Sequence, residues 1–431
     1  MGWCVPLATL DFEEVLGRRR GQGAPAVRRK VAEIVEAVRV GGDETVRALT
    51  REFDGVDLPD PRVPAADVRA ALAGIGGELR GAIEFAAERV RTVCSAERPL
   101  AVIEVPVRHG VQVRIYREPI ERVAVYVPAG RAPLPSSAIM GVTPAQVAGV
   151  REIVVLTPPG PNGKADRTTL AACALLGVEE VFLIGGAQAV AAAAYGTKTL
   201  RPVHKLVGPG NIWVTEAKRQ LQGVIGIDGL NGPSEVLVLA EPPAPAQQIA
   251  RDLLAQAEHD PESWAVLVTS SPELRQAVER EMARLVQECG AEEILGRPGV
   301  GVVLTPDAAA AVRFAAAFAP EHLELWGESA ASATAVRSAG AVFVACPTPL
   351  GDYAAGPNHI LPTGGSARYA SPLGVEDFMR RRTETQVVGD ASSVVSAAAT
   401  LADAEGLSMH RMALQGFQEV MMPWRNALQS S

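Results

Sequence analysis

Cysteine is scarce in this sequence, and its placement argues against two common kinds of site. The chain of 431 residues has five cysteines, and no two of them form a Cys-x-x-Cys pair. An odd and scattered set argues against a disulfide framework and against a zinc site built from thiolates. Free cysteines are typical of a reducing compartment, so we expect a cytoplasmic protein.

The sequence also lacks long apolar runs and long runs of positive charge. No apolar stretch approaches the roughly 20 residues that cross a bilayer, and the N-terminus does not have the basic region and apolar core of a secretory signal. The formal net charge is −8, so the chain as a whole repels phosphate backbones. We therefore expect a soluble protein that binds neither a membrane nor nucleic acid.

Aromatic residues are few, whereas small and apolar residues are abundant. Phe, Trp and Tyr make up 4% of the chain, against 48% for all hydrophobic residues. Small side chains such as Ala, Val and Gly suit the close packing of helices on sheets in α/β folds. A chain of this length exceeds one simple core and indicates two or more domains.

Short runs of β-branched residues alternate with Ala- and Leu-rich stretches from residue 122 onward. Apolar residues are consecutive in these runs, which is typical of parallel strands covered on both faces. We expect strands at 122–128, 152–158, 180–186, 205–208, 236–240, 264–270, 300–306, 322–327 and 341–346. In the second half the expected helices lie at 246–258, 273–289, 307–318 and 330–338. The pattern predicts two α/β units with mainly parallel sheets.

The two ends of the chain have a different pattern. Residues 24–55 and 65–97 carry apolar residues at helical spacing and predict an all-helical lead-in that packs on one of the sheets. The last segment, from about residue 374, is also predicted to be helical.

No G-x-G-x-x-G motif follows the first strand, but two other glycine turns join a strand to a helix. They are "LIGGAQAVA" (183–191) and "VGPGNIWV" (207–214). Each turn alone is more often a steric requirement than a ligand site. Two of them at consecutive strand ends favour a phosphate-bearing ligand, because helix N-termini bind anions and ligands gather at the carboxyl edge of parallel strands.

Gln256 and His259 stand three residues apart at the end of a predicted helix and therefore share one of its faces. Glutamine is a weak ligand, so the local pattern favours a solvated helix end. Asp352 and His359 lie in a long glycine-rich segment, 351–365, of a kind that is often functional. An ordinary surface or packed histidine is the commoner interpretation of each histidine alone. Together with His410, however, these residues would supply mixed nitrogen and oxygen ligands for a metal.

Taken together, the motifs resemble the histidinol dehydrogenase family from about residue 20 to residue 415. The matching segments occur in the family's order and at about its spacing; they include "VGPGNIWVTEAKR", "NGPSEVLVLA", "QAEHD", "APEHLEL", "GDYAAGPNHILPTGG" and "AEGLSMH". The resemblance implies a zinc-dependent oxidation of L-histidinol to L-histidine through histidinal with two NAD+, the last step of histidine biosynthesis. It also implies a homodimer with shared active sites.

The resemblance implies roles for individual residues. It implies a catalytic acid/base pair at Glu321 and His322, and zinc ligands at Gln256, His259, Asp352 and His410. The implied substrate contacts are Ser234, Gln256, His259, His322, Asp352, His359, Glu405 and His410, of which Glu405 and His410 would come from the partner subunit. The implied NAD+ contacts are Tyr126, Gln188 and Asn211.

These roles suit the chemistry of the residues. Histidine titrates near neutral pH, which suits His322 as the base that takes a hydroxyl proton. A carboxylate such as Glu321 suits the activation of water, which must attack the intermediate aldehyde. A zinc ion with open positions would orient the substrate.

With this resemblance, the expected fold is α/β with two incomplete Rossmann-like parallel-sheet domains, a helical N-terminal lead-in and a helical C-terminal tail. The predicted parts are an extension at 1–21, a larger domain at 22–125 and 235–373, an inserted NAD-contacting domain at 126–234, and a tail at 374–431. The larger domain would carry most of the metal and catalytic residues, and the tail would reach the partner subunit.

Two other functions are considered. A relative within the same superfamily would oxidise another small polar alcohol, such as a sulfonated diol; the presence of Ser234 and Glu405 argues against it. A non-catalytic paralogue that only binds metal or nucleotide would lack an acid/base or metal residue, and no such residue is missing.

Overall fold

The computed structural model describes residues 8–11, 13, 15, 25–129, 134–332 and 334–417. Its contacts divide the chain into two compact units. Unit 1 comprises Met1–Arg98 and Ile120–Phe378, and unit 2 comprises Pro99–Pro119 and Met379–Ser431. No helix of the described residues is long and apolar enough to cross a membrane.

Unit 1 contains a five-stranded parallel sheet with the strand order β6-β5-β4-β7-β8. The strands are β4 (Arg122–Tyr126), β5 (Glu152–Thr157), β6 (Val181–Leu183), β7 (Lys205–Val207) and β8 (Gly226–Ile227). Its helices are α5 (Pro135–Ala148), α6 (Arg167–Leu175), α7 (Gly186–Tyr195) and α8 (Ile212–Leu221). Every residue of β4 is buried, as the consecutive apolar residues of this run predict for a strand covered on both faces.

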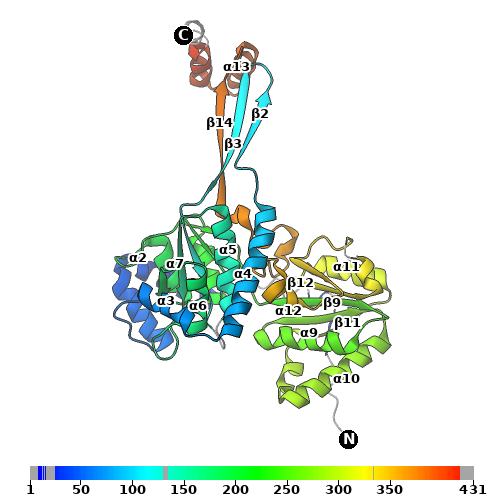
Figure 1. Cartoon of the computed structure of the whole chain (residues 1–431). Helices are drawn as coiled ribbons and strands as arrows, with labels where there is room; N and C mark the ends of the chain where they lie inside the picture. Colours follow the sequence, from blue (N-terminus) through cyan, green and yellow to red (C-terminus); the bar gives the residue numbers. More distant parts are fainter. Residues whose placement is uncertain are drawn as a thin grey trace. The chain divides into compact units, whose positions relative to one another are not determined.

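The predicted N-terminal helices pack on the helices of this sheet. They are α2 (Pro25–Asp54), which kinks at Gly42, α3 (Ala65–Ala73) and α4 (Gly77–Glu97). Helix α2 lies against α7 and α8, α3 against α6, and α4 against α5 (Figure 1). The predicted helical lead-in is therefore confirmed.

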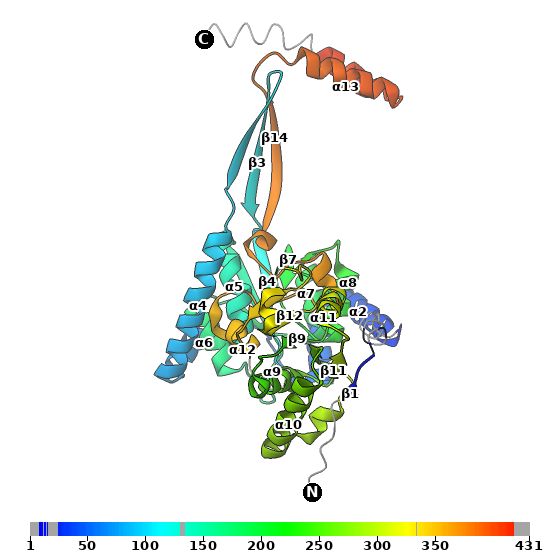
Figure 2. The ribbon, with the colours of Figure 1, turned by 90° about the vertical axis from the view of Figure 1, so that its right-hand side faces the viewer.

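The second sheet of unit 1 has six parallel strands in the order β1-β11-β10-β9-β12-β13. They are β1 (Ala8–Thr9), β9 (Glu235–Glu241), β10 (Trp264–Thr269), β11 (Val300–Leu304), β12 (His322–Gly327) and β13 (Ala341–Val344). Helices α9 (Ala246–His259) and α10 (Pro272–Cys289) pack on the face that includes Val236 and Val238. Helix α11 (Ala308–Phe318) packs on the opposite face, with Leu237 and Leu239 (Figure 2). The predicted α/β class with two parallel sheets is confirmed.

The chain between β12 and the end of unit 1 is mostly irregular. The helix predicted at 330–338 is wrong: a short 3-10 helix, η2 (Glu328–Ser332), is followed by turn and irregular backbone over 334–339. Ser and Thr are frequent there, and their hydroxyls compete with helical hydrogen bonds; Ser338 Oγ donates to the carbonyl of Ala316 instead. After β13 come α12 (Thr348–Leu350), a one-turn π-helix η3 (Gly351–Ala355), η4 (Ser366–Arg368) and η5 (Val375–Phe378).

Unit 2 is built on an antiparallel sheet with the order β14-β3-β2. Its strands are β2 (Val102–Val107), β3 (Val111–Pro119) and β14 (Met379–Val387), and α13 (Ser392–Ala404) and helical residues 408–417 follow. The tail predicted to be helical from 374 is helical over Ser392–Ala404 and 408–417, but it begins with the 3-10 helix η5 and then strand β14. This strand is rich in charged residues and largely exposed; its ion pairs with β3, such as Arg382 with Glu118, take the place of a buried apolar face.

The domain limits predicted at residues 126, 234 and 373 stay a prediction, because the contacts do not divide unit 1 between its two sheets.

Candidate functional site

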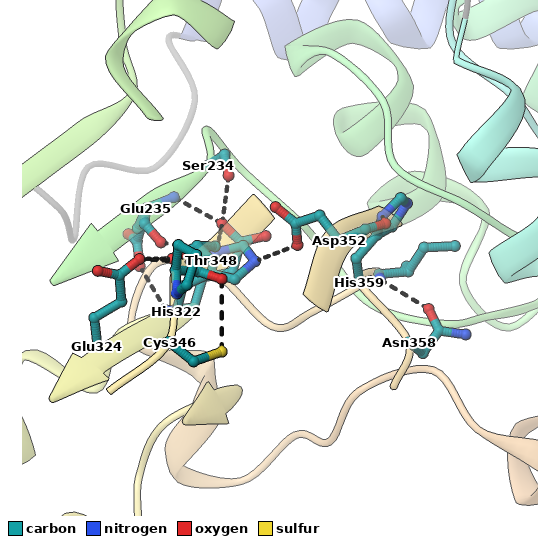
Figure 3. A network of polar contacts seen from close by, with 12 residues as sticks. Ser234, Glu235, His322, Glu324, Cys346, Thr348, Asp352, Asn358 and His359 are labelled. Carbon is teal, nitrogen blue, oxygen red and sulfur yellow. Dashed lines mark hydrogen bonds and ion pairs between the residues drawn. The ribbon is translucent and has the colours of Figure 1, made fainter. Parts of the chain in front are cut away.

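Several polar residues gather at the amino ends of two neighbouring strands, β9 and β12. These strands pair in parallel, with His322 opposite Val236. Ser234 and Glu235 therefore lie beside Glu321, and Figure 3 shows both of them near His322. Helix α11 ends shortly before β12 at Ala319, which has a left-handed backbone conformation (φ 50°).

The Glu321 carboxylate is held by two donors on one oxygen. Its Oε2 accepts hydrogen bonds from Ser234 Oγ and from the backbone N–H of Glu235, both at 2.7 Å. The residue is buried. Because both bonds reach Oε2 and none from the described residues reaches Oε1, the second oxygen is left to bind water or substrate.

The His322 ring is buried between two acceptors. Nδ1 lies 3.1 Å from the Glu235 carbonyl, which can only accept, so Nδ1 carries a proton. Nε2 lies 3.0 Å from Asp352 Oδ1. Burial lowers the pKa of His322, but the Glu321 and Asp352 carboxylates outweigh it and raise that pKa well above its ordinary value.

Asp352 lies in the π-helical turn η3, a conformation that is frequent at functional sites. Its carbonyl accepts a 2.7 Å hydrogen bond from His359 Nδ1, which joins the start of the glycine-rich segment to its middle. Burial raises the pKa of Asp352, but the hydrogen bond from His322 and the nearby charges of His359 and His259 bring it below its ordinary value. Burial lowers the pKa of His359.

Gln256 and His259 both lie in the last two turns of helix α9. Gln256 is buried, and its Nε2 has no hydrogen-bond partner among the described residues. The nitrogen and oxygen of a side-chain amide can exchange places with little change in shape. The position of Gln256 Nε2 could therefore equally be occupied by its Oε1, which can bind a metal ion. His259 is exposed at the end of α9, and its effect on the pKa of Asp352 indicates that the two side chains are near each other.

The residue types of the predicted zinc ligands are distributed over both units of the chain. Within the described part of one chain, no three His, Cys, Asp or Glu side chains gather into a metal-binding group. Of the predicted ligands, Gln256, His259 and Asp352 belong to unit 1. His410 and Glu405 are exposed residues of unit 2, and the structure describes them only within that unit. An amide oxygen, an imidazole and a carboxylate are suitable zinc ligands once a fourth is added.

The residues predicted to contact a dinucleotide lie at the carboxyl edge of the five-stranded sheet. Tyr126 ends β4, Gln188 is in the first turn of α7 after β6, and Asn211 follows β7. The Tyr126 hydroxyl accepts a 3.1 Å hydrogen bond from the backbone N–H of Gly186, and burial raises the pKa of Tyr126 to about 12. Asn211 caps α8, where its Oδ1 accepts from the N–H groups of Trp213 and Val214.

Packing alone requires glycine in the turn before α8, whether or not a ligand binds there. Gly208 has a left-handed backbone (φ 116°), and a Cβ atom there would lie 2.2 Å from the Tyr126 carbonyl oxygen. Glycine is therefore required for close approach of β7 and β4.

Three buried carboxyl groups near the site were not singled out from the sequence. Glu235 is 2% exposed, and Glu324 and Asp252 are also buried. Glu324 accepts from the N–H of Thr348 and from Trp326 Nε1, and burial, together with the charge of Glu324, raises the pKa of Asp252 to about 8. An acidic residue inside an apolar strand run, as in "SEVLVLA" and "HLELW", is the signal that could have found the two glutamates.

Comparison with known proteins gives a consistent result. A profile of the histidinol dehydrogenase family matches residues 17–416. Histidinol dehydrogenase of Bacillus anthracis is 40% identical over 397 residues, covering 90% of this chain and 92% of that protein. The Thermobifida fusca enzyme of the same name is 44% identical over 395 residues, covering 89% and 90%. The crystal structure of histidinol dehydrogenase from Elizabethkingia anophelis superimposes with a TM-score of 0.88 at 30% identity, covering 96% of this chain and 97% of that one.

Proposed function

The chain belongs to the histidinol dehydrogenase family, a family of oxidoreductases, and on this premise we propose that it oxidises L-histidinol to L-histidine with two NAD+ per substrate. This would be the last step of histidine biosynthesis. The observation that carries the proposal is the buried pair of Glu321 and His322, held in fixed orientation with Asp352 Oδ1 3.0 Å from the His322 ring. The overall reaction converts an alcohol and one water into a carboxylate, two NADH and three protons.

His322 is the proposed acid/base group. Because Nδ1 donates to the Glu235 carbonyl, Nε2 is the nitrogen that would exchange the hydroxyl proton. Nε2 donates to Asp352 Oδ1 in this structure, so it would first release that contact and its proton, and would then take the hydroxyl proton while hydride leaves for NAD+. In the second half of the reaction Glu321 would take a proton from water through Oε1, since its Oε2 is occupied by Ser234 and Glu235. Water attack on the aldehyde then permits the second hydride transfer.

Gln256, His259 and Asp352 would hold the zinc ion together with His410 of the partner subunit. The zinc would orient the substrate by binding its imidazole and amino nitrogens. We propose a homodimer on the family resemblance, with Glu405 of the partner subunit as a further substrate contact. Ser234 and His359 are the proposed substrate contacts within the chain.

Tyr126, Gln188 and Asn211 are the proposed NAD+ contacts. Their common position at the carboxyl edge of a parallel sheet supports this assignment, because ligands of open α/β sheets bind at that edge. The N-terminus of α7, where Gly186 lies, is also favourable for an anionic group of the cofactor.

The proposal is tested by the stoichiometry of the reaction. Purified protein, supplied with zinc, NAD+ and L-histidinol, should form about two NADH for each histidinol consumed and yield histidine. A sulfonated diol serves as the comparison substrate. Absence of turnover with histidinol in metal-loaded protein would overturn the proposal.

The zinc assignment has its own test, which does not depend on turnover. His259→Ala should lose bound zinc, as measured by elemental analysis, whereas Glu321→Gln should keep zinc and lose turnover by roughly 10²–10⁴-fold. Treatment with a chelator should abolish activity, and added zinc should restore it. Full zinc content in His259→Ala would contradict the ligand set.

A further inference from the structure

We propose that Glu235 is a positioning residue for the acid/base pair, which it holds through backbone and side-chain hydrogen bonds to Glu321 and His322. The inference rests on the proposed function for the identity of that pair. Glu235 would not touch the substrate. Its effect would be to keep the Glu321 carboxylate and the His322 ring in the orientation that proton transfer requires.

Glu235 and Glu321 contact each other reciprocally. The backbone N–H of Glu235 donates to Glu321 Oε2 at 2.7 Å, and the backbone N–H of Glu321 donates to Glu235 Oε2 at 3.4 Å. The two residues stand at equivalent positions, one before Val236 of β9 and one before His322 of β12, which are register partners. Each glutamate thus holds the main chain of the other.

The same residue also determines which nitrogen of His322 faces outward. The Glu235 carbonyl accepts from His322 Nδ1 at 3.1 Å, so the proton on Nδ1 is fixed and Nε2 faces Asp352 Oδ1, 3.0 Å away. A single residue therefore contacts both proposed catalytic side chains. A small displacement of its backbone would move both of them together.

The Glu235 carboxylate also anchors a neighbouring loop. Its Oε1 accepts a 3.1 Å hydrogen bond from the backbone N–H of Gly364, and the adjacent Thr363 Oγ1 accepts from the N–H of Gly232. The carboxylate is thus a buried acceptor for two backbone donors on separate segments. A glutamine at this position has the same length, but one of its two terminal groups is an NH2 group, which cannot accept a hydrogen bond. One of the two backbone donors would therefore lose its acceptor.

Proton transfer depends on the positions of the reacting groups within a few tenths of an ångström, and substitution of a residue that holds such a group in place typically costs about 10–100-fold in activity. We expect Glu235→Gln to lower kcat about 10–100-fold with KM for histidinol within about 2-fold and with unchanged zinc content. Glu235→Asp, which keeps the charge and at least one acceptor contact, should recover part of the lost kcat.

A matched control lies at the other end of the same strand. Glu241 is also a buried carboxylate of β9, and it accepts from the N–H and Oγ of Ser270. Glu241→Gln should lower Tm by a similar amount but leave kcat unchanged. If Glu235→Gln keeps the wild-type kcat, or if Glu241→Gln loses kcat equally, Glu235 has only a structural role and the inference is overturned.

The test separates failure of this inference from failure of the proposed function. Wild-type turnover of histidinol decides the function. Protein labelled with ¹⁵N-histidine decides the positioning whatever the substrate is, because the chemical shift of the His322 Nδ1 signal reports its hydrogen bond to the Glu235 carbonyl. The His322 signal, assigned with His322→Gln, should move in Glu235→Gln and Glu235→Asp but not in Glu241→Gln; an unmoved signal would overturn the inference even if a variant folds poorly.

Discussion

At the scale of single residues, the buried carboxyl groups behind the proposed catalytic pair differ in how they are satisfied. Glu324 accepts hydrogen bonds on both oxygens, from Thr348 and Trp326. Asp252 has one oxygen bonded to Gln248, while its Oδ2 has no hydrogen-bond partner among the described residues. When Asp252 is protonated, its carboxyl O–H can donate a hydrogen bond to the Glu324 carboxylate, which agrees with the raised pKa of Asp252.

Asp252 should therefore lower the free energy of unfolding as the pH rises from mildly acidic to mildly alkaline values. Its folded-state pKa of about 8 lies above the value of about 3.9 in an unfolded chain. The stabilising neutral form is fully present below about pH 4, and its contribution is lost as the pH rises through about 8. Asp252→Asn should reduce the drop in Tm between pH 6 and pH 9 by about 2 °C or more, since roughly 1 kcal/mol moves Tm by 2–4 °C. An identical drop in both proteins would contradict this.

Tyr126 gives a second prediction at this scale. Tyr126→Phe removes the acceptor for the Gly186 N–H at the start of α7. Loss of one such bond costs about 0.5–1.5 kcal/mol, so the affinity for NAD+ should fall about 2–10-fold. Calorimetric titration with NAD+ measures the change, and Tyr195→Phe, at the far end of α7, should bind normally. Equal affinities in both variants would argue against Tyr126 as a cofactor contact.

At the scale of elements, the π-helical turn η3 depends on one glycine. Gly351 packs on the Phe343 ring, and a Cβ atom there would lie 2.3 Å from Phe343 Cε1. Its backbone is ordinary, with φ −67°, so the requirement is one of space and not of strain. The turn carries Asp352, and any shift of the turn moves this proposed ligand.

Gly351→Ala should therefore lower zinc content and reduce kcat by about 10-fold or more. A shorter side chain at residue 343 should relieve the clash. The double variant Gly351→Ala/Phe343→Leu should therefore recover part of the zinc content and part of kcat. Elemental analysis and NADH formation measure the two effects. A single variant with full zinc and activity would show that the turn tolerates the displacement.

The elements that the sequence predicts well are those whose apolar pattern reflects local burial. All nine predicted strands of the two parallel sheets are present, because strands buried on both faces need consecutive apolar residues. Strand β14 was missed because it is stabilised by pairing with β3 and by ion pairs, and neither leaves an apolar pattern in its own sequence. The helix predicted at 330–338 is absent. The prediction relied on the alanines of this segment and gave too little weight to its Ser and Thr hydroxyls, which compete for helical hydrogen bonds.

The same distinction applies to the candidate site. Histidines and carboxylates in polar loops, such as His322 and Asp352, could be singled out from the sequence, and the structure places their side chains 3.0 Å apart. The apolar run around Glu235 could have marked it as a buried charge but not its role, because that role lies in main-chain contacts with a residue 86 positions away. Contacts of that kind depend on strand register, which residue types alone do not determine.

At the scale of the whole molecule, the proposed site is divided between two units of the chain. Gln256, His259 and Asp352 belong to unit 1, whereas Glu405 and His410 belong to unit 2. If unit 2 of one subunit completes the site of its partner, neither His259→Ala nor His410→Ala homodimers should be active. A mixed dimer of the two variants would still contain one intact site.

Co-expression of His259→Ala and His410→Ala chains should therefore restore about one quarter of wild-type activity after random assembly into dimers. The two homodimers, purified separately and mixed without unfolding, serve as the control. Light scattering gives the oligomeric state. A co-expressed sample as inactive as either variant would contradict shared sites and favour sites built within one chain.

The sheet of unit 2 has a consequence for the order in which the protein can be completed during synthesis. Strands β2 and β3 form a hairpin early in the chain, but β14, which pairs with β3 over nine residues, emerges only after Ile120–Phe378 has been made. Until then one edge of β3 is open to other strands, and an isolated two-stranded hairpin is only marginally stable. A ribosome that stops just before residue 379 therefore releases a chain that contains all of unit 1 but whose unit 2 still has an unpaired edge on β3.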